Sequence, residues 1–254
     1  IFLLDDPPHV LKRVAARMQN NGITWGDGAP MGMEILKGVW MTNKYANGGP
    51  LALSPATKLS EEHFSGNSAT KMRVKFAAQV LSGTMVNLID FTITRGNSLF
   101  IHVPPNTTMD AFLSRARELC GKFNRWFDIC NSKEKHNGND KDYVHVQKGT
   151  SADGITKELL DLLRWVEQWK ASHTTTRPDG KIIIDWDSFL TKETYESLKL
   201  VCFSFAALIK EVCTDKERAL LLKALSQDLC ENHFGHCRGS VGSTDMPNQQ
   251  QERP

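Results

Sequence analysis

The 254-residue sequence contains no apolar run approaching the length of about eighteen residues that a membrane-spanning helix needs. It also has no basic start followed by an apolar stretch and a small-residue cleavage site, the pattern of a secretory signal. A large excess of charge of one sign is also missing, because 31 Lys and Arg residues against 29 Asp and Glu residues give a net charge of +2. We therefore expect no membrane partner, while contact with nucleic acid is permitted but is not argued by charge alone.

Cysteine is sparse, and its spacing does not form a framework. The six cysteines lie mainly within apolar, helix-like patterns: Cys120, Cys130, Cys202, Cys213, Cys230 and Cys237. Such placement favours buried thiols in a reducing compartment over a disulfide-stapled fold. We expect an intracellular protein.

Standard nucleotide-binding loops are missing as well. The phosphate-cradling pattern G-x-x-x-x-G-K-[ST] does not occur. Asn43-Lys44 begins the N-K-x-D guanine box of Ras-like proteins but lacks its aspartate. Any nucleotide site must therefore use other residues, and without a group that positions water we expect no hydrolysis.

What the sequence does contain is helical periodicity. Apolar residues recur every three or four positions, which is typical of amphipathic helices. In the clearest case, residues 109–130, Thr107 or Thr108 can cap the start, and one stripe comprises Phe112, Ala116, Leu119, Phe123, Phe127 and Cys130. Further helices are expected over 31–40, 71–88, 155–169, 194–212 and 215–234, with short extended segments over 1–4 and 182–186. The pattern predicts a mainly α fold.

Two acidic strings near the ends of the sequence could carry chemistry. Asp6 follows the apolar run 1–4 and precedes Pro7-Pro8, a setting that suits a metal ligand because the backbone is constrained; the alternative is an ordinary helix N-cap. Asp228 and Glu231 stand three residues apart, so both project from one face of a helix. Their alternative is an exposed acidic pair.

Zinc is a further alternative at the C-terminal string. Its possible ligands all fall within eight residues: Cys230, His233, His236 and Cys237. One short helical segment cannot easily surround a metal tetrahedrally, and no second Cys/His cluster supports it. Zinc is the weaker hypothesis.

The run FNRWFDICNS from Phe123 to Ser132 is the most diagnostic segment. Asn124, Phe127 and Asp128 stand at i, i+3 and i+4, one patch of a single helix. A carboxylate can accept hydrogen bonds from the N1–H and amino group of guanine, and an aromatic ring can stack on the base. The alternative is that the phenylalanines are core and the polar residues solvated.

Several short motifs, in order along the chain, resemble those of the eukaryotic P-element transposase family. They are DPPHVLK from Asp6, KLSEEHF from Lys58, SATKMRVKFAAQVLS from Ser68, FNRWFDICNS from Phe123, FLTKET from Phe189, QDLCENHF from Gln227 and a looser tail through Arg238, Gly242 and Pro247. In that family a helical GTP-binding insertion domain splits an RNase H-like nuclease.

The resemblance implies a role for each matching residue. Asp6 and Glu231 would be catalytic ligands of Mg²⁺, since paired hard cations stabilise attacking and leaving oxygens. Asp228 would join Asn124, Phe127 and Asp128 at the guanine base. Lys58, Lys71 and Arg73 could meet phosphates, although basic residues on solvated faces are common.

The implied organisation is a helical insertion domain over 26–222, flanked by pieces of an RNase H-like α/β fold over 1–25 and 223–254. The first catalytic aspartate would lie upstream, so the chain is expected to be a fragment without activity of its own. The implied function is GTP-dependent and metal-dependent DNA cleavage and transfer by a nuclear homo-oligomer. The alternatives are a domesticated, catalytically silent GTP- or DNA-binding protein, or a plain helical scaffold.

Overall fold

The computed structural model describes residues 5–20, 22–46, 56–66, 73–96, 100–103, 107–132, 146–147, 150–213 and 219–226. Within these residues the chain is mainly helical, as predicted. The helices are α1 (Pro7–Asn20), α2 (Met33–Ala46), α4 (Val74–Val80), α5 (Gly83–Arg95), α6 (Met109–Cys130), α7 (Thr150–Ser172) and α8 (Lys192–Val212), with single 3₁₀ turns η1 (Glu61–Phe64) and η2 (Leu222–Leu225).

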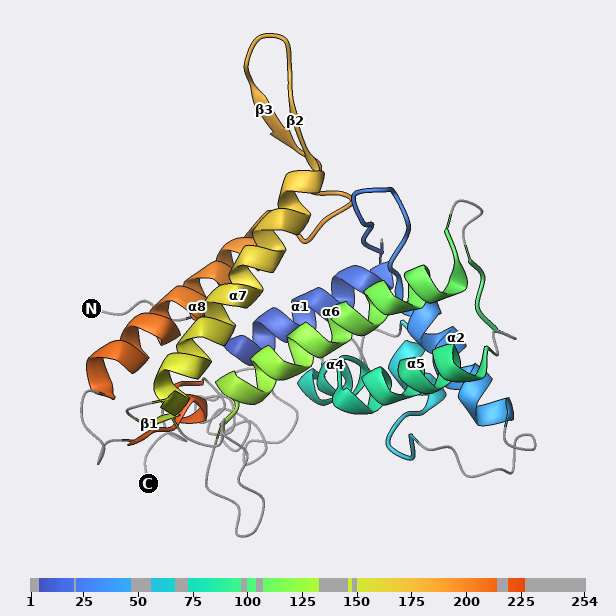
Figure 1. Ribbon diagram of the computed structural model, residues 1–254, viewed down its shortest axis with the longest axis horizontal. Helices are drawn as coiled ribbons and strands as arrows, with labels where there is room; N and C mark the ends of the chain where they lie inside the picture. Colours follow the sequence, from blue (N-terminus) through green and yellow to red (C-terminus); the bar gives the residue numbers. More distant parts are fainter. Residues whose placement is uncertain are drawn as a thin grey trace, which may run out of the picture.

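The helices form one body with α1 and α6 at its centre (Figure 1). The α7–α8 pair packs on one side, and α2, α4 and α5 pack on the other. Helix α1 contacts α2, α4, α6 and α8, because Val10, Leu11 and Val14 on it are fully buried. The first helix of the chain is therefore part of the same core as the helices that follow it.

Helix α6 begins and ends where the sequence predicts. Thr108 caps it, since its side-chain oxygen accepts from the backbone N–H of Ala111 at 3.3 Å. The apolar stripe is buried along its length, with Phe112 and Phe123 fully enclosed and Phe127 partly exposed. This long helix provides the rigid surface on which the predicted nucleotide residues lie.

The single helix predicted over 71–88 is wrong: the chain forms two helices, α4 and α5. The first ends at Val80 with Leu81 as its C-cap, and Ser82 caps the second, its hydroxyl accepting from the backbone N–H of Met85 at 3.3 Å. The break shifts the buried face, so Thr84 is exposed while Met85, Leu88 and Ile89 are enclosed. A Ser-Gly pair favours such a break, because serine caps well and glycine is a poor helix former.

The same stretch, Val74–Arg95, is the one segment among the described residues long and apolar enough by composition to cross a membrane, with a mean hydropathy of 1.3. It is not one straight rod, because Ser82 divides it, and its buried residues pack against α1, α2 and α6. The contacts are those of core helices.

The strands are short and pair locally. β1 (Val146–Gln147) pairs with β4 (Ala219–Leu220), and β2 (Thr174–Thr176) pairs with β3 (Ile182–Ile184), both antiparallel. The extended segment expected over 182–186 is thus confirmed at β3. The helix expected over 215–234 is wrong in its described part, where β4 and η2 stand instead.

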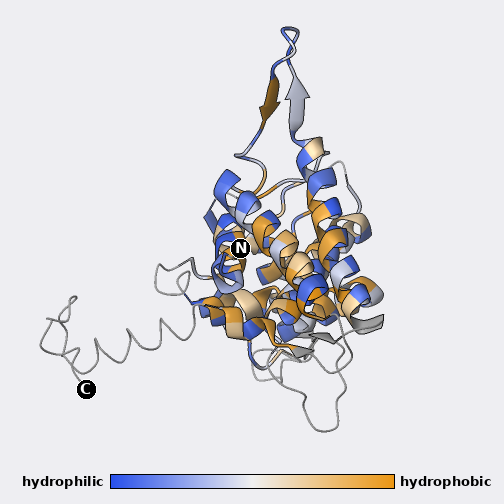
Figure 2. Cartoon of the chain, turned by 90° about the vertical axis from the view of Figure 1, so that its left-hand side faces the viewer, coloured by the Kyte–Doolittle hydropathy of each residue, from blue (hydrophilic) through white to orange (hydrophobic). Residues whose placement is uncertain are grey.

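The β2–β3 hairpin projects from the end of α7 well beyond the helical body (Figures 1 and 2). Its register pairs Thr174 with Ile184, Thr175 with Ile183 and Thr176 with Ile182.

Buried thiols are confirmed for the four cysteines that the structure describes, Cys120, Cys130, Cys202 and Cys213. Burial raises the pKa of Cys120 and of Cys202 to about 12, and in Cys202 a hydrogen bond with Trp126 acts weakly in the other direction. Burial, with a contribution from Cys202, raises the pKa of Cys130 well above its usual value. Cys230 and Cys237 lie outside the described residues.

Candidate functional site

Asn124 and Asp128 form a hydrogen-bonded pair on the last turns of α6. The side-chain amide nitrogen of Asn124 donates to Oδ2 of Asp128 at 3.1 Å. Its oxygen accepts from the backbone N–H of Gly83 at 2.9 Å, at the first residue of α5. One asparagine therefore satisfies a helix N-terminus and fixes a carboxylate at the same time.

The carboxylate lies close to the positive end of a helix dipole. Asp128 is half-buried and is bound to Asn124, which itself contacts the N-terminal turn of α5. Negative charge is favoured near a helix N-terminus. The N-terminus of α5 therefore contributes positive potential around the Asp128 side chain.

Phe127 lies on the same side of α6 as this pair, because it is three residues after Asn124 and adjoins Asp128. It packs against the core but is only partly buried, unlike Phe123, which is fully enclosed. The alternative that both phenylalanines are purely core holds for Phe123 alone. A partly exposed ring beside a fixed carboxylate can stack on a flat base.

The end of α6 is joined to the segment that precedes the C-terminal acidic string. The carbonyl of Ser132 accepts from the backbone N–H of Lys223 at 3.2 Å, and its hydroxyl accepts from the backbone N–H of Leu222 at 3.4 Å. Leu222 and Ser132 are both buried. Residues 222–226 therefore lie against the end of α6, one helical turn from Asp128.

Asp228 and Glu231 lie outside the described residues, and so do the zinc ligands of the alternative hypothesis. Asp228 is the second residue after Ser226 in the sequence, a stretch of chain of at most about 7 Å.

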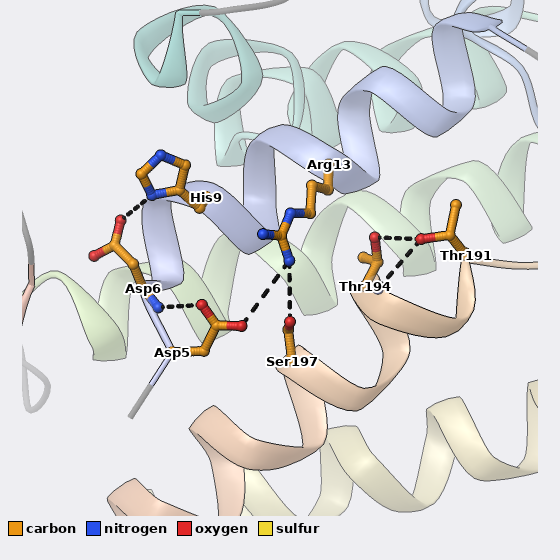
Figure 3. A network of polar contacts seen from close by, with 7 residues as sticks. All are labelled: Asp5, Asp6, His9, Arg13, Thr191, Thr194 and Ser197. Carbon is orange, nitrogen blue, oxygen red and sulfur yellow. Dashed lines mark hydrogen bonds and ion pairs between the residues drawn. The ribbon is translucent and has the colours of Figure 1, made fainter. Parts of the chain in front are cut away.

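Asp6 is buried at the start of α1, where its carbonyl accepts from the backbone N–H of Val10 at 3.1 Å. The helix-start interpretation of this residue therefore holds for its main chain. Its carboxylate is engaged separately, with Oδ2 2.6 Å from Nδ1 of His9 (Figure 3). The imidazole orients a buried carboxylate, an arrangement also found around metal ligands.

The neighbouring carboxylate ties this turn to α8. Asp5 accepts from the backbone N–H of Asp6 at 2.8 Å, and its second oxygen lies 3.9 Å from Nη1 of Arg13. The same Arg13 nitrogen donates to the hydroxyl of Ser197 at 3.0 Å (Figure 3). The turn that carries Asp6 is therefore held on two sides.

The described residues do not by themselves complete a metal centre. No group of three or more His, Cys, Asp or Glu side chains in this part of the chain could hold an ion. Asp6 with His9 offers one carboxylate that is already hydrogen-bonded. A hard cation needs further oxygen ligands, so the described residues do not fit Mg²⁺ without a contribution from elsewhere.

The basic residues predicted to meet phosphates are not brought to Asn124 by any contact among the described residues. Lys58 is exposed on the turn before η1, and Arg73 is exposed at the start of α4, with its guanidinium 5.5 Å from the Phe76 ring. Lys71 lies outside the described residues. Helix α4 spans about 10 Å between Arg73 and the Ser82 break beside Asn124.

The motif beginning at Lys58 acts as a structural unit. His63 is buried, with Nδ1 3.1 Å from the backbone nitrogen of Ser60 and Nε2 2.9 Å from Oε1 of Gln79. Leu59 and Phe64 fill the core on either side. These contacts bind η1 to α4, which explains the spacing of the motif without a ligand.

Two residues that sequence analysis overlooked support the candidate site. Gly83 supplies the N–H that fixes Asn124, and Ser132 joins α6 to η2. The Ser82-Gly83 pair was a recognisable helix-start signal. Ser132 was recognised only as the last residue of the FNRWFDICNS run, and its contact with η2 could not be predicted, because its partners are ninety residues further along the chain.

The fold and this arrangement define a helical domain whose polar pair lies at a helix junction rather than in a glycine-rich loop. Residues 9–143, just over half of the chain, match the family described as TNP-like, GTP-binding insertion domain. The chain belongs to this family, which confirms the predicted P-element-type resemblance and the helical GTP-binding class.

Two relatives extend this assignment. The chain is 29% identical over 133 residues, 52% of its length, to Transposable element P transposase of Drosophila melanogaster, of which the match covers 15%. It also superposes on the structure titled "Drosophila P element transposase strand transfer complex" with a TM-score of 0.69 and 21% identity. That match covers 99% of this chain and 49% of the other, so the chain spans half or less of both relatives.

Proposed function

We propose that this chain is the guanine-nucleotide-binding portion of a P-element-like DNA transposase. The observation that carries the proposal is the Asn124–Asp128 pair, fixed at the N-terminus of α5 beside the partly exposed ring of Phe127. Membership of the GTP-binding insertion domain family supports it. Lys58, Lys71 and Arg73 remain proposed phosphate contacts.

Guanine recognition would rest on the Asp128 carboxylate. A carboxylate can accept hydrogen bonds from guanine N1–H and its 2-amino group, and the bond from Asn124 fixes its orientation. Adenine lacks this pair of donors. Asn124 is a positioning residue in this scheme, because both ends of its amide are engaged within the protein.

Asp228 would complete the base site from the other side. Its chain distance from Ser226 and the docking of η2 on Ser132 support its approach to the end of α6. Three residues further on, Glu231 would act with Asp6 as a Mg²⁺ ligand. Nucleotide binding would then be coupled through one short segment to the nuclease.

The remainder of the proposal follows the family resemblance. Residues 1–25 and 223–254 would belong to an RNase H-like fold, with 26–222 as the insertion domain. The whole protein would cleave and transfer DNA strands in the nucleus as a homo-oligomer, using GTP and divalent metal. The catalytically silent, domesticated form remains the alternative.

The test is calorimetric titration of GTP, ITP and ATP into the chain and into Asp128→Asn. We expect GTP to bind best, ITP more weakly because inosine lacks the 2-amino group, and ATP least. Charge-assisted hydrogen bonds contribute about 1.5–3 kcal/mol each, so loss of the two proposed bonds should lower GTP affinity by at least about 100-fold. It should also lose the preference for GTP over ITP.

The matched control is Asp110→Asn, the same substitution at an exposed position in the first turn of α6. It should leave GTP affinity within about twofold. Equal GTP and ATP affinity in the unchanged chain, or an Asp128→Asn variant that keeps its GTP preference, would show that Asp128 does not read the base.

A further inference from the structure

The β2–β3 hairpin is an arm with a rigid base and a tip that extends into solvent. Both views show it standing clear of the helices (Figures 1 and 2). A two-stranded hairpin is at best marginally stable in water without packing. Its persistence must therefore be explained by the contacts at its base and within its turn.

The base is fixed by Arg17 of α1. The buried guanidinium donates from Nε to the carbonyl of Phe189 at 3.0 Å, and from Nη2 to those of Trp186 at 2.8 Å and Asp187 at 2.6 Å. His173 adds a bond from Nε2 to the carbonyl of Thr24 at 2.9 Å. The arm is thus held at a fixed angle to the body.

The turn at the tip is closed by its own backbone. The N–H of Gly180 donates to the carbonyl of Arg177 at 2.9 Å, and Gly180 has a φ of 80°, a conformation that favours glycine. The carboxylate of Asp179 accepts from the backbone N–H of Lys181 at 2.9 Å. The one acidic side chain at the tip is therefore used in shaping the turn.

Arg177 and Lys181 are cross-strand neighbours. The N–H of Arg177 donates to the carbonyl of Lys181 at 2.9 Å, which continues the strand register by one pair. Side chains alternate between faces, so these two cations share a face with Thr175 and Ile183. Like charges directly opposite each other destabilise a hairpin.

No ion pair involves either cation among the residues that the structure describes, and both side chains are exposed. A destabilising pair of cations, with a hydroxyl next to it on a rigid arm, suits an anionic partner. Arginine, lysine and threonine are typical phosphate contacts, and a two-stranded ribbon fits the major groove of duplex DNA.

We propose that the β2–β3 hairpin is a DNA-binding arm that contacts the phosphate backbone through Arg177, Lys181 and Thr175. The choice of DNA as the partner rests on the proposed transposase function, while the surface itself is defined by the hairpin. Ile182, which is 65% exposed, lies on the opposite face with Thr176 and can contact the groove wall.

The test is fluorescence anisotropy of a labelled 30-base-pair duplex with the 254-residue chain at several salt concentrations. The Arg177→Gln/Lys181→Gln variant should bind at least tenfold more weakly at about 50 mM salt. Because each phosphate contact contributes about 0.9 to the slope of log affinity against log salt, that slope should fall by about 1.8.

The matched control is Lys157→Gln/Arg164→Gln, which removes the same two charges from exposed positions on α7. It should change affinity less than twofold. The charge-conserving Arg177→Lys/Lys181→Arg variant should retain binding. Circular dichroism must show that each variant is folded, as expected for exposed tip positions.

An equal loss of DNA affinity in the hairpin variant and in the control would overturn the proposal. Failure of the unchanged chain to bind the duplex would also overturn it. A variant that keeps its DNA affinity but changes oligomeric state would instead assign the arm to a protein partner. GTP titration of the same variant separates the two proposals, because the hairpin projects from the end of α7 beyond the helical body (Figure 1) and GTP affinity should be unchanged.

Discussion

At the scale of single residues, Asn124 has two structural duties. Its oxygen accepts the first backbone N–H of α5, and its nitrogen holds Asp128. Alanine there would leave a partly buried N–H without its side-chain partner and release the carboxylate. The residue is thus needed for stability before it is needed for any ligand.

We therefore expect Asn124→Ala to lower the free energy of unfolding by about 1–2 kcal/mol, the usual cost of a lost helix cap. For a chain of this size the melting temperature should fall by about 2–8 °C in a thermal denaturation experiment. Asn87→Ala, at an exposed position on α5, is the control and should shift it by less than about 2 °C. An equal shift in both variants would show that the Asn124 side chain does not stabilise the junction of α5 and α6.

At the scale of elements, one guanidinium makes three of the hydrogen bonds that hold the base of the hairpin. Arg17 donates to three backbone carbonyls from a largely buried position. Lysine keeps the charge but cannot reproduce the planar fork of donors. The orientation of the arm should therefore be more sensitive to this residue than to any side chain on the arm itself.

Arg17→Lys should lower the free energy of unfolding by about 3 kcal/mol, because hydrogen bonds to charged groups contribute about 1.5–3 kcal/mol each. Hydrogen exchange of the amides in 174–184 should accelerate along with the loss of stability. Arg13→Lys provides the comparison, since Arg13 is exposed and makes one side-chain bond to Ser197. Hairpin exchange that is unaltered by Arg17→Lys would mean that other contacts hold the base.

The elements also show what periodicity can and cannot predict. Helix α6 was predictable at both ends, because a capping threonine and an uninterrupted apolar stripe agree. The apolar stripe over 71–88 did not reveal the break at Ser82, because α4 and α5 each have an apolar face and the two together look like one helix in the sequence. Non-local contacts determine the structure at η2. Ser132 accepts hydrogen bonds from the backbone N–H groups of Leu222 and Lys223, which a continuous helix over 215–234 would have used within itself.

The candidate site was predictable in part for the same reason. One helix carries Asn124, Phe127 and Asp128, so their proximity followed from spacing. The N–H of Gly83 contacts Asn124 only because α5 packs on α6, and no pattern within 123–132 predicts this contact. Arg17 was overlooked for a similar reason, since its partners are about 170 residues away.

At the scale of the whole molecule, the described body ends at Ser226, two residues before Asp228. A chain that stops after Ser226 keeps every described helix, including η2 on Ser132. It removes the proposed second wall of the base site. The truncation therefore separates folding from nucleotide binding.

With GTP at about 100 times its dissociation constant, the 254-residue chain should gain about 2.7 kcal/mol of stability and melt about 5–10 °C higher. The chain that ends at Ser226 should melt within a few degrees of the longer one without nucleotide, yet gain less than half of that shift. Thermal melts with GTP and with ATP measure both quantities. A full GTP shift in the shorter chain would place the whole base site on α6 and its neighbours.

The bonds from Arg17 to Trp186, Asp187 and Phe189 also determine how late in synthesis the fold can be completed. During synthesis at roughly 5–20 residues per second, about 10–35 s separate the emergence of residue 17 from that of residue 189. The side of α1 that faces α8 stays without its partner for that interval, while α2, α4 and α6 can already pack. Ribosome-bound nascent chains should therefore acquire their protease-resistant form only after residue 189 leaves the exit tunnel.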